Sequence, residues 1–145
     1  MTEIGSWLEH PERLAGFDSL FFNNGSVATL VSTQRTSGEA HSAAEKFALA
    51  MDRNPIWIED VPGLVLPRII ACLANEAAFA AGEGVAERET IDLAMRLGTN
   101  YPRGPLAWAQ EIGYAQIVAI LDFLHSEYGE ERYRVAPSLR RWARI

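Results

Sequence analysis

The stretch Asp60–Arg68, with the sequence D-V-P-G-L-V-L-P-R, marks the point at which the chain changes its pattern. Pro62 and Gly63 inside it are strong turn signals. Before this stretch, short runs of β-branched and aromatic residues indicate strands. After it, apolar residues recur at helical spacing. The sequence therefore predicts a mainly α protein in two parts: a small three-stranded α/β segment at residues 1–60 and an all-helical domain at residues 61–145.

The first part is expected to form three strands and one helix. The strands are predicted at Ser19–Phe22, Val27–Thr33 and Pro55–Glu59. The sequence N-N-G at residues 23–25 is a turn signal between the first two. An amphipathic helix is predicted at Glu39–Arg53, because apolar residues recur there at helical spacing. They are Ala40, Ala44, Phe47, Ala48 and Met51. A layer of this size cannot bury a core of its own, so we expect it to pack on something else.

The second part is expected to form helices at Leu64–Gly82, Arg88–Leu97, residues 105–113, Tyr114–Tyr128 and Pro137–Arg144. Glycines and prolines supply the boundaries, as at Gly98, where the second helix is predicted to end. The first helix is apolar nearly all round, which is typical of a helix buried on several sides. Because the chain is short, we expect a subunit partner to cover one side, in a homodimer through Leu64, Ile70, Leu73 and Phe79.

Composition limits the class of protein and its partners. The chain has 145 residues, 48% of them hydrophobic, which suits an ordinary globular core. A net charge of −6 argues against non-specific binding to nucleic acid. The longest apolar run, Ile69–Ala74, is too short to span a bilayer. With a single cysteine, Cys72, and no secretory signal, we expect a cytoplasmic protein without a membrane partner.

Further motifs follow the turn at residues 62–63. They are N-E-A at residues 75–77, G-V-A-E-R-E-T-I-D-L-A-M at 84–95, G-T-N-Y-P-R-G-P at 98–105 and R-Y-R-V-A-P-S-L-R-R-W at 132–142. In this order they resemble the C-terminal helical domain of 3-hydroxyacyl-CoA dehydrogenases, over roughly the last 85 residues. Residues 11–24, P-E-R-L-A-G-F-D-S-L-F-F-N-N, resemble the segment that ends the nucleotide-binding domain of that family. The combination is similar to the degenerate second half of two-repeat 3-hydroxybutyryl- or 3-hydroxyadipyl-CoA dehydrogenases, a reduced Rossmann segment joined to a helical domain.

The resemblance implies that three catalytic positions are replaced in this chain. Leu20 stands where the family has the histidine that acts as general base on the substrate hydroxyl. Ser32 stands at the position of the glutamate that orients this histidine, and Pro67 at that of an asparagine near the substrate carbonyl. A leucine transfers no proton, a serine carries no charge and a proline side chain donates no hydrogen bond. We therefore expect no hydride transfer by this chain alone.

The cofactor half of such an enzyme is also missing. A dinucleotide site needs G-x-G-x-x-G between a strand and a helix. The nearest match, Gly82-Glu83-Gly84, follows a helix and leads to Glu87 where a glycine is required. No NAD site and no other cofactor is therefore expected.

Two other groups of residues are candidates for binding. In the resembling enzymes the loop Gly98–Pro105 borders the acyl pocket, so Asn100, Tyr101 and Arg103 are candidate acyl-CoA contacts. The glycines and prolines of this loop are explained equally well as residues that end one helix and begin the next. The C-terminal arginines fit either a solvated helix end or a contact with a CoA phosphate. They are Arg132, Arg134, Arg140, Arg141 and Arg144.

A metal site is not expected. His41 and Glu45 lie four residues apart on a predicted helix, a spacing that suits two metal ligands. The sequence offers no recognisable third ligand nearby, so a solvated helix face is favoured over a metal centre.

Two functional hypotheses follow from the sequence. In the first, the chain is a dimerisation or acyl-CoA-binding module related to 3-hydroxyacyl-CoA dehydrogenases and is not catalytic alone. In the second, it is an accessory subunit that completes an active site with a separate NAD-binding chain. A residual gene product without a role is a third possibility. Whether the chain is an enzyme stays open at this point, because fold resemblance alone does not determine function.

Overall fold

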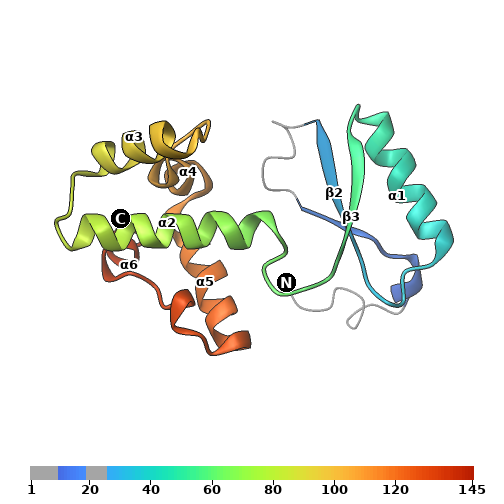
Figure 1. Cartoon of the computed structure of the whole chain (residues 1–145). Helices are drawn as coiled ribbons and strands as arrows, with labels where there is room; N and C mark the ends of the chain where they lie inside the picture. Colours follow the sequence, from blue (N-terminus) through green and yellow to red (C-terminus); the bar gives the residue numbers. More distant parts are fainter. Residues whose placement is uncertain (1–9, 19–25) are drawn as a thin grey trace. The chain divides into compact units, whose positions relative to one another are not determined.

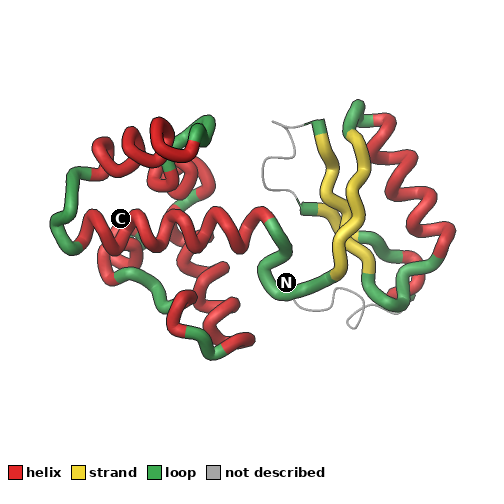
Figure 2. The backbone as a smooth tube through the Cα atoms, viewed as in Figure 1, coloured by secondary structure: helices red, strands yellow, loops and turns green. Residues whose placement is uncertain are grey.

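The computed structural model describes residues 10–18 and 26–145. The chain divides into two compact units, Met1–Leu66 and Pro67–Ile145 (Figure 1). Among its described residues, the first contains a sheet and one α-helix, and the second is helical (Figure 2). This architecture confirms the predicted fold class of a mainly α protein with a small α/β segment. Within the described residues, none of the helices is long and apolar enough to cross a membrane.

The sheet of the first unit has the order β1-β2-β3. The strands are β1 (Gly16–Phe17), β2 (Val27–Ser32) and β3 (Asn54–Glu59). β1 is antiparallel to β2, and β2 is parallel to β3 with Leu30 opposite Trp57. A short 3-10 helix, η2 (Pro11–Arg13), precedes β1. The strand predicted at Ser19–Phe22 lies outside the described residues, as does its turn, whereas the strand at Gly16–Phe17 was not predicted.

Helix α1 (Gly38–Ala50) connects the two parallel strands and lies against one face of the sheet (Figure 1). The Ser37 hydroxyl caps it by accepting a hydrogen bond from the Ala40 N–H at 3.2 Å. The core beneath it consists of Ala28, Leu30, Ala44, Ala48 and Trp57. Phe47 and Met51, which belong to the apolar repeat of this helix, have exposed side chains. A sheet of three strands is too narrow to cover more than the alanine face of this helix.

The helical unit contains α2 (Leu66–Gly82), α3 (Arg88–Thr99), α4 (Pro105–Ile112), α5 (Tyr114–Tyr128), η4 (Glu131–Tyr133) and α6 (Pro137–Trp142). All five predicted α-helices are present, but three boundaries differ from the prediction. α2 begins at Leu66 rather than Leu64, because Gly63 and Leu64 both have positive φ angles. α3 continues through Gly98 to Thr99, and the residue after its end, Asn100, takes the left-handed conformation with φ 57°. α6 ends at Trp142 rather than Arg144.

Helix α2 runs through the middle of the helical unit, between the α3–α4 pair and the α5–α6 pair (Figure 1). Its buried face consists of Ile70, Ala71, Ala74, Asn75, Ala77 and Ala78. Ile117, Leu121 and Leu124 of α5 and Leu139 of α6 are the large, fully buried apolar side chains of this core. The small residues on α2 allow its backbone to approach α6 closely: the Ser138 hydroxyl donates a hydrogen bond to the Ala78 carbonyl.

Candidate functional site

The three positions that the resemblance predicts to have lost catalytic residues fall in different parts of the chain. Leu20 lies outside the described residues. Ser32 is the last residue of β2 and is half-buried; its carbonyl accepts a hydrogen bond from the Asp60 N–H at 3.2 Å. Pro67 is the second residue of α2 and belongs to the helical unit. In the described part of the chain, these positions supply a neutral hydroxyl and a pyrrolidine ring, neither of which is a general base at neutral pH.

Asp60, which directly follows β3, was quoted in the sequence only as part of a motif. Both of its carboxylate oxygens are buried, and no described residue forms a hydrogen bond with them. A carboxylate without a donor is an unusual arrangement, because buried polar groups normally find a partner. Its N–H contact with Ser32 places it at the carboxyl ends of the two parallel strands. Its position next to V-P-G was visible in the sequence, but its burial depends on tertiary packing.

The loop between α3 and α4 holds the three predicted substrate residues in three different settings. Asn100 is the left-handed residue that ends α3, and it is exposed. The Tyr101 ring packs against Trp108 of α4, with 5.5 Å between ring centroids. Arg103 forms an ion pair with Glu111 at the other end of α4. Their acyl-CoA contact remains a prediction, while each also has a structural role in joining α3 to α4.

Arg103 lines a surface hollow of about 450 Å³ between α3 and the start of α4. The other lining residues are Glu89, Asp92, Leu93, Arg96, Pro102, Gly104 and Ala107. The lining of the hollow therefore combines apolar residues with two guanidinium groups and two carboxylates. Neither Asn100 nor Tyr101 belongs to its lining, so the structure brings only one of the three predicted residues to it.

Asp92 lines this hollow and was missed by sequence reasoning. Its two carboxylate oxygens accept hydrogen bonds from the Leu106 and Ala107 N–H groups, both at 2.8 Å. These are first-turn amides of α4, which have no partner within their own helix. Gly104, immediately before α4, leaves room for the Asp92 side chain, since a Cβ atom there would lie within 3.0 Å of it. A cap supplied by another helix leaves no local signal in the sequence.

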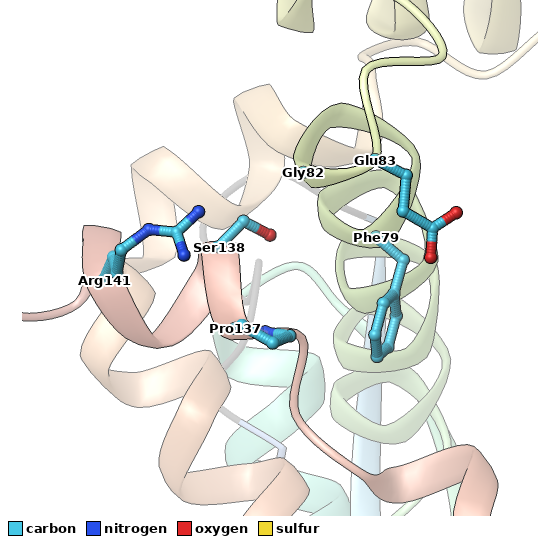
Figure 3. A pocket seen from close by; sticks show the side chains of 6 residues that line it. All are labelled: Phe79, Gly82, Glu83, Pro137, Ser138 and Arg141. Atoms are coloured by element: carbon cyan, nitrogen blue, oxygen red, sulfur yellow. The ribbon is translucent and has the colours of Figure 1, made fainter.

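A second, smaller hollow of about 160 Å³ lies between the end of α2 and α6 (Figure 3). Phe79, Gly82 and Glu83 line it from the α2 side, and Pro137, Ser138 and Arg141 from the α6 side (Figure 3). The Ser138 hydroxyl is committed to the Ala78 carbonyl. Arg141 and Glu83 carry opposite charges on its two sides, so the hollow has no net charge with which to select an ion.

Most of the C-terminal arginines are engaged within the chain. Arg132 pairs with Glu130, Arg134 with Glu131, and Arg140 forms two hydrogen bonds with Asp122. The hydrogen bond to Asp122 raises the pKa of the Arg140 guanidinium, and that to Glu130 raises the pKa of Arg132. Two interpretations of this segment were open: a solvated helix end or a contact with a CoA phosphate. The contacts favour the solvated helix end over a phosphate site built from all five arginines.

The remaining candidates have structural explanations. The indole of Trp57 stacks on the His41 ring at 4.0 Å and donates a hydrogen bond to Glu45 at 3.0 Å, so it links the two residues considered as metal ligands. No group of three candidate metal ligands occurs among the described residues. Burial raises the pKa of the Cys72 thiol, which keeps it protonated and poorly nucleophilic.

The G-E-G sequence at residues 82–84 ends helix α2. Gly84 has a φ of 75°, its N–H bonds to the Ala81 carbonyl, and the Val85 N–H bonds to the Ala80 carbonyl at 3.0 Å. This pair of hydrogen bonds is the Schellman pattern of a helix C-terminus. The glycines therefore serve helix termination, whereas a phosphate-binding loop would lie at a helix N-terminus.

Comparison with known proteins agrees with this organisation. Residues 63–145 match the family model of the C-terminal domain of 3-hydroxyacyl-CoA dehydrogenase. The chain is 40% identical over 119 residues to 3-hydroxyadipyl-CoA dehydrogenase of Escherichia coli, covering 82% of this chain and 25% of that protein. It is 37% identical over 147 residues to a probable 3-hydroxybutyryl-CoA dehydrogenase of Bacillus subtilis, covering 99% of this chain and 50% of that protein.

Among solved structures, the (S)-3-hydroxybutyryl-CoA dehydrogenase of Ralstonia eutropha superimposes with a TM-score of 0.84 at 34% sequence identity. The match covers 97% of this chain and 50% of that one. The chain thus spans between a quarter and a half of the length of these relatives. Because the family model matches more than half of the chain, the chain belongs to the 3-hydroxyacyl-CoA dehydrogenase family.

Proposed function

We propose that this chain is a non-catalytic assembly module of the 3-hydroxyacyl-CoA dehydrogenase family, which pairs with a second copy of itself through the outer face of α2. The observation that carries the proposal is the exposure of large apolar side chains on a helix whose opposite face forms the core. Ile69 is 49% exposed, and Leu73, one turn further on, is half-buried. An apolar stripe of this kind on a central helix is typical of a surface covered by a partner.

The side chains proposed for this contact differ in how accessible they are within the chain. Leu64 and Ile70 are only 2% and 3% exposed within the chain, so their side chains are already covered and offer nothing to a partner. Leu73 and Phe79 remain partly accessible, although Arg134 lies over the Phe79 ring at 4.9 Å. Ile69 therefore takes the place of Ile70 in the proposed contact.

The proposal that this chain is not catalytic alone rests on the residues at the three positions where the family has catalytic groups. Ser32 and Pro67 provide no base, and Leu20 by its chemistry provides none either. The alternative partner is a separate NAD-binding chain of the same family, with which this chain would complete an active site. That partner would give a heterodimer instead of a homodimer, and turnover of a 3-hydroxyacyl-CoA would then require both chains.

Substituting Ile69 by aspartate tests the proposed pairing. A carboxylate placed in an apolar contact loses its hydration without gaining a partner, so Ile69→Asp is expected to convert dimers into monomers. Sedimentation velocity of the purified chain measures the change. Ile145→Asp, at the exposed C-terminus, is the matched control and should keep the wild-type mass. If Ile69→Asp sediments as the wild type does, α2 is not the contact surface.

A second candidate function, acyl-CoA binding, is favoured by the hollow of about 450 Å³ beside Arg103. Acetoacetyl-CoA titrated calorimetrically into the chain is expected to bind equally well with and without NADH. Arg103→Ala should weaken binding about tenfold, since a guanidinium is a strong partner for phosphate and carbonyl oxygens. Arg144→Ala is the control for general loss of positive charge. If the titration gives no heat of binding, or if Arg103→Ala binds as the wild type does, the hollow beside Arg103 is not an acyl-CoA site.

A further inference from the structure

Helix α3 is attached to its unit differently from the helices around it. None of its residues, all of which the structure describes, is buried. One face of the helix is half-buried and consists of Arg88, Ile91, Asp92 and Met95, while all its other residues are exposed. α5, by contrast, buries Ile117, Leu121 and Leu124 completely. α3 therefore contributes no fully buried apolar side chain to the core of the helical unit.

Two charged side chains on the half-buried face bind the neighbouring helices. Arg88 Nη2 donates a hydrogen bond to the Tyr114 hydroxyl at 2.6 Å, and the guanidinium lies 4.6 Å from the centroid of the Trp142 ring. The Asp92 carboxylate accepts the two hydrogen bonds from the first turn of α4. A charged group that leaves such contacts regains hydrogen bonds to water, whereas a released leucine exposes apolar surface. α3 is thus held largely by contacts that cost little free energy to break.

The segments that flank α3 leave its two ends room to move. Before the helix, Gly84 has a φ of 75°, and no atom lies within 4 Å of the place where a Cβ would be. Val85, which follows it, is 72% exposed. After the helix, residues 100–104 form a turn to α4 that begins at the exposed, left-handed Asn100. A glycine changes its backbone angles with little steric cost, so Gly84 is a suitable hinge.

We propose that α3 is a conformational switch of this chain, which undocks from the helical unit as one piece about Gly84 and residues 100–104, with the Asp92 carboxylate as its latch. The hollow of about 450 Å³ has walls from both α3 and α4, so it exists only while α3 is docked. Undocking therefore controls whether the hollow is available to bind anything. None of the latching contacts involves Ile69, so undocking and pairing through α2 are separate properties.

Two other behaviours of a surface helix are distinguishable from undocking. A helix that is firmly part of its unit opens only when the whole unit unfolds. A helix that frays loses protection of its amides progressively from the ends toward the middle. An isolated helix of 12 residues is marginal in water, so an undocked α3 melts and its amides exchange together. One shared opening constant for the middle of α3 is therefore the signature of the switch.

Hydrogen exchange of the whole chain, followed by NMR for each amide at several low urea concentrations, measures these opening constants. The amides of Asp92–Arg96 are expected to share one value, about a hundredfold or more larger than that of the α5 amides. This value should depend little on urea, because undocking exposes little surface, whereas exchange in the middle of α5 should accelerate steeply. A common opening constant for α3 and α5, or protection that falls off gradually along α3, would overturn the proposal.

Three variants identify the latch. Asp92→Asn replaces one acceptor oxygen by a donor and should raise the opening constant of α3 about tenfold. Glu89→Gln removes the same charge from the exposed side of α3 and should leave that constant unchanged. Asn75→Ala removes two buried hydrogen bonds of α2, so it should accelerate exchange in α5 but not in α3. Equal effects of Asp92→Asn and Glu89→Gln, or faster exchange of α3 in Asn75→Ala, would contradict a latched, locally opening helix.

Discussion

Replacing Asn75 by alanine is expected to lower the free energy of unfolding of the helical unit by about 3 kcal/mol. The Asn75 side chain is 1% exposed and bonds two backbone groups of the segment between η4 and α6. Its Nδ2 donates to the Arg134 carbonyl at 2.9 Å, and its Oδ1 accepts from the Ala136 N–H at 2.8 Å. Alanine leaves both backbone groups without a partner in the interior, which costs about 1–3 kcal/mol for each.

In a unit of this size, such a loss corresponds to a fall in melting temperature of about 10 °C or more. Circular dichroism at 222 nm during heating measures it. Glu76→Ala, one residue along on the exposed side of α2, is the control and should melt close to the wild type. Asn75→Asp keeps the volume but puts an oxygen opposite the Arg134 carbonyl, so it should also be destabilised. A wild-type melting temperature for Asn75→Ala would show that the two hydrogen bonds of the Asn75 side chain add no stability.

Gly104→Ala is expected to destabilise the helical unit by about 2 kcal/mol, because it expels the Asp92 cap from the start of α4. The backbone at Gly104 has φ −75° and ψ 155°, which an alanine adopts without strain. The obstacle is the Asp92 side chain, which an added Cβ would meet within 3.0 Å. Moving it away breaks the hydrogen bonds to Leu106 and Ala107.

A double-mutant cycle separates this mechanism from a general effect of alanine. Asp92→Ala alone removes the cap and should cost about 1–2 kcal/mol. In that background, Gly104→Ala has no carboxylate to displace and should cost little more. Urea denaturation of the four proteins gives the coupling energy. Additive losses at the two positions would mean that Gly104 is needed for a reason other than the Asp92 cap.

Sequence patterns predicted the helices well because their ends are determined locally. Pro105 and Pro137 open α4 and α6, and the left-handed Gly129 closes α5, each by a backbone preference of the residue itself. The helix end predicted at Gly98 was wrong, because a second residue nearby has the same local preference. Asn100, two residues later, also tolerates the left-handed conformation and caps the end of α3 instead.

The features that sequence patterns did not reveal depend on residues distant in the chain. Asp92 caps a helix that begins thirteen positions later, and Asn75 bonds to a segment some sixty residues away. Periodicity places Phe47 in the apolar repeat of α1, yet its side chain is exposed, because the width of the sheet decides how much of α1 is covered. For the candidate site, motif order identified the family, and the replaced positions that it implies stay a prediction. The hollow beside Arg103 could not be read from motifs, because it arises only when α3 and α4 pack together.

The placement of Trp57 between His41 and Glu45 has a practical consequence for spectroscopy. Trp57 is held in the unit of residues 1–66, whereas Trp108 and Trp142 belong to the helical unit. Trp7, the fourth tryptophan of the sequence, lies outside the described residues. Indole emission depends on the neighbours of each ring, and a stacked imidazole next to Trp57 makes its surroundings unlike those of Trp108 and Trp142. The chain therefore contains a native fluorophore in each unit, and no foreign dye has to be attached to follow the two units separately.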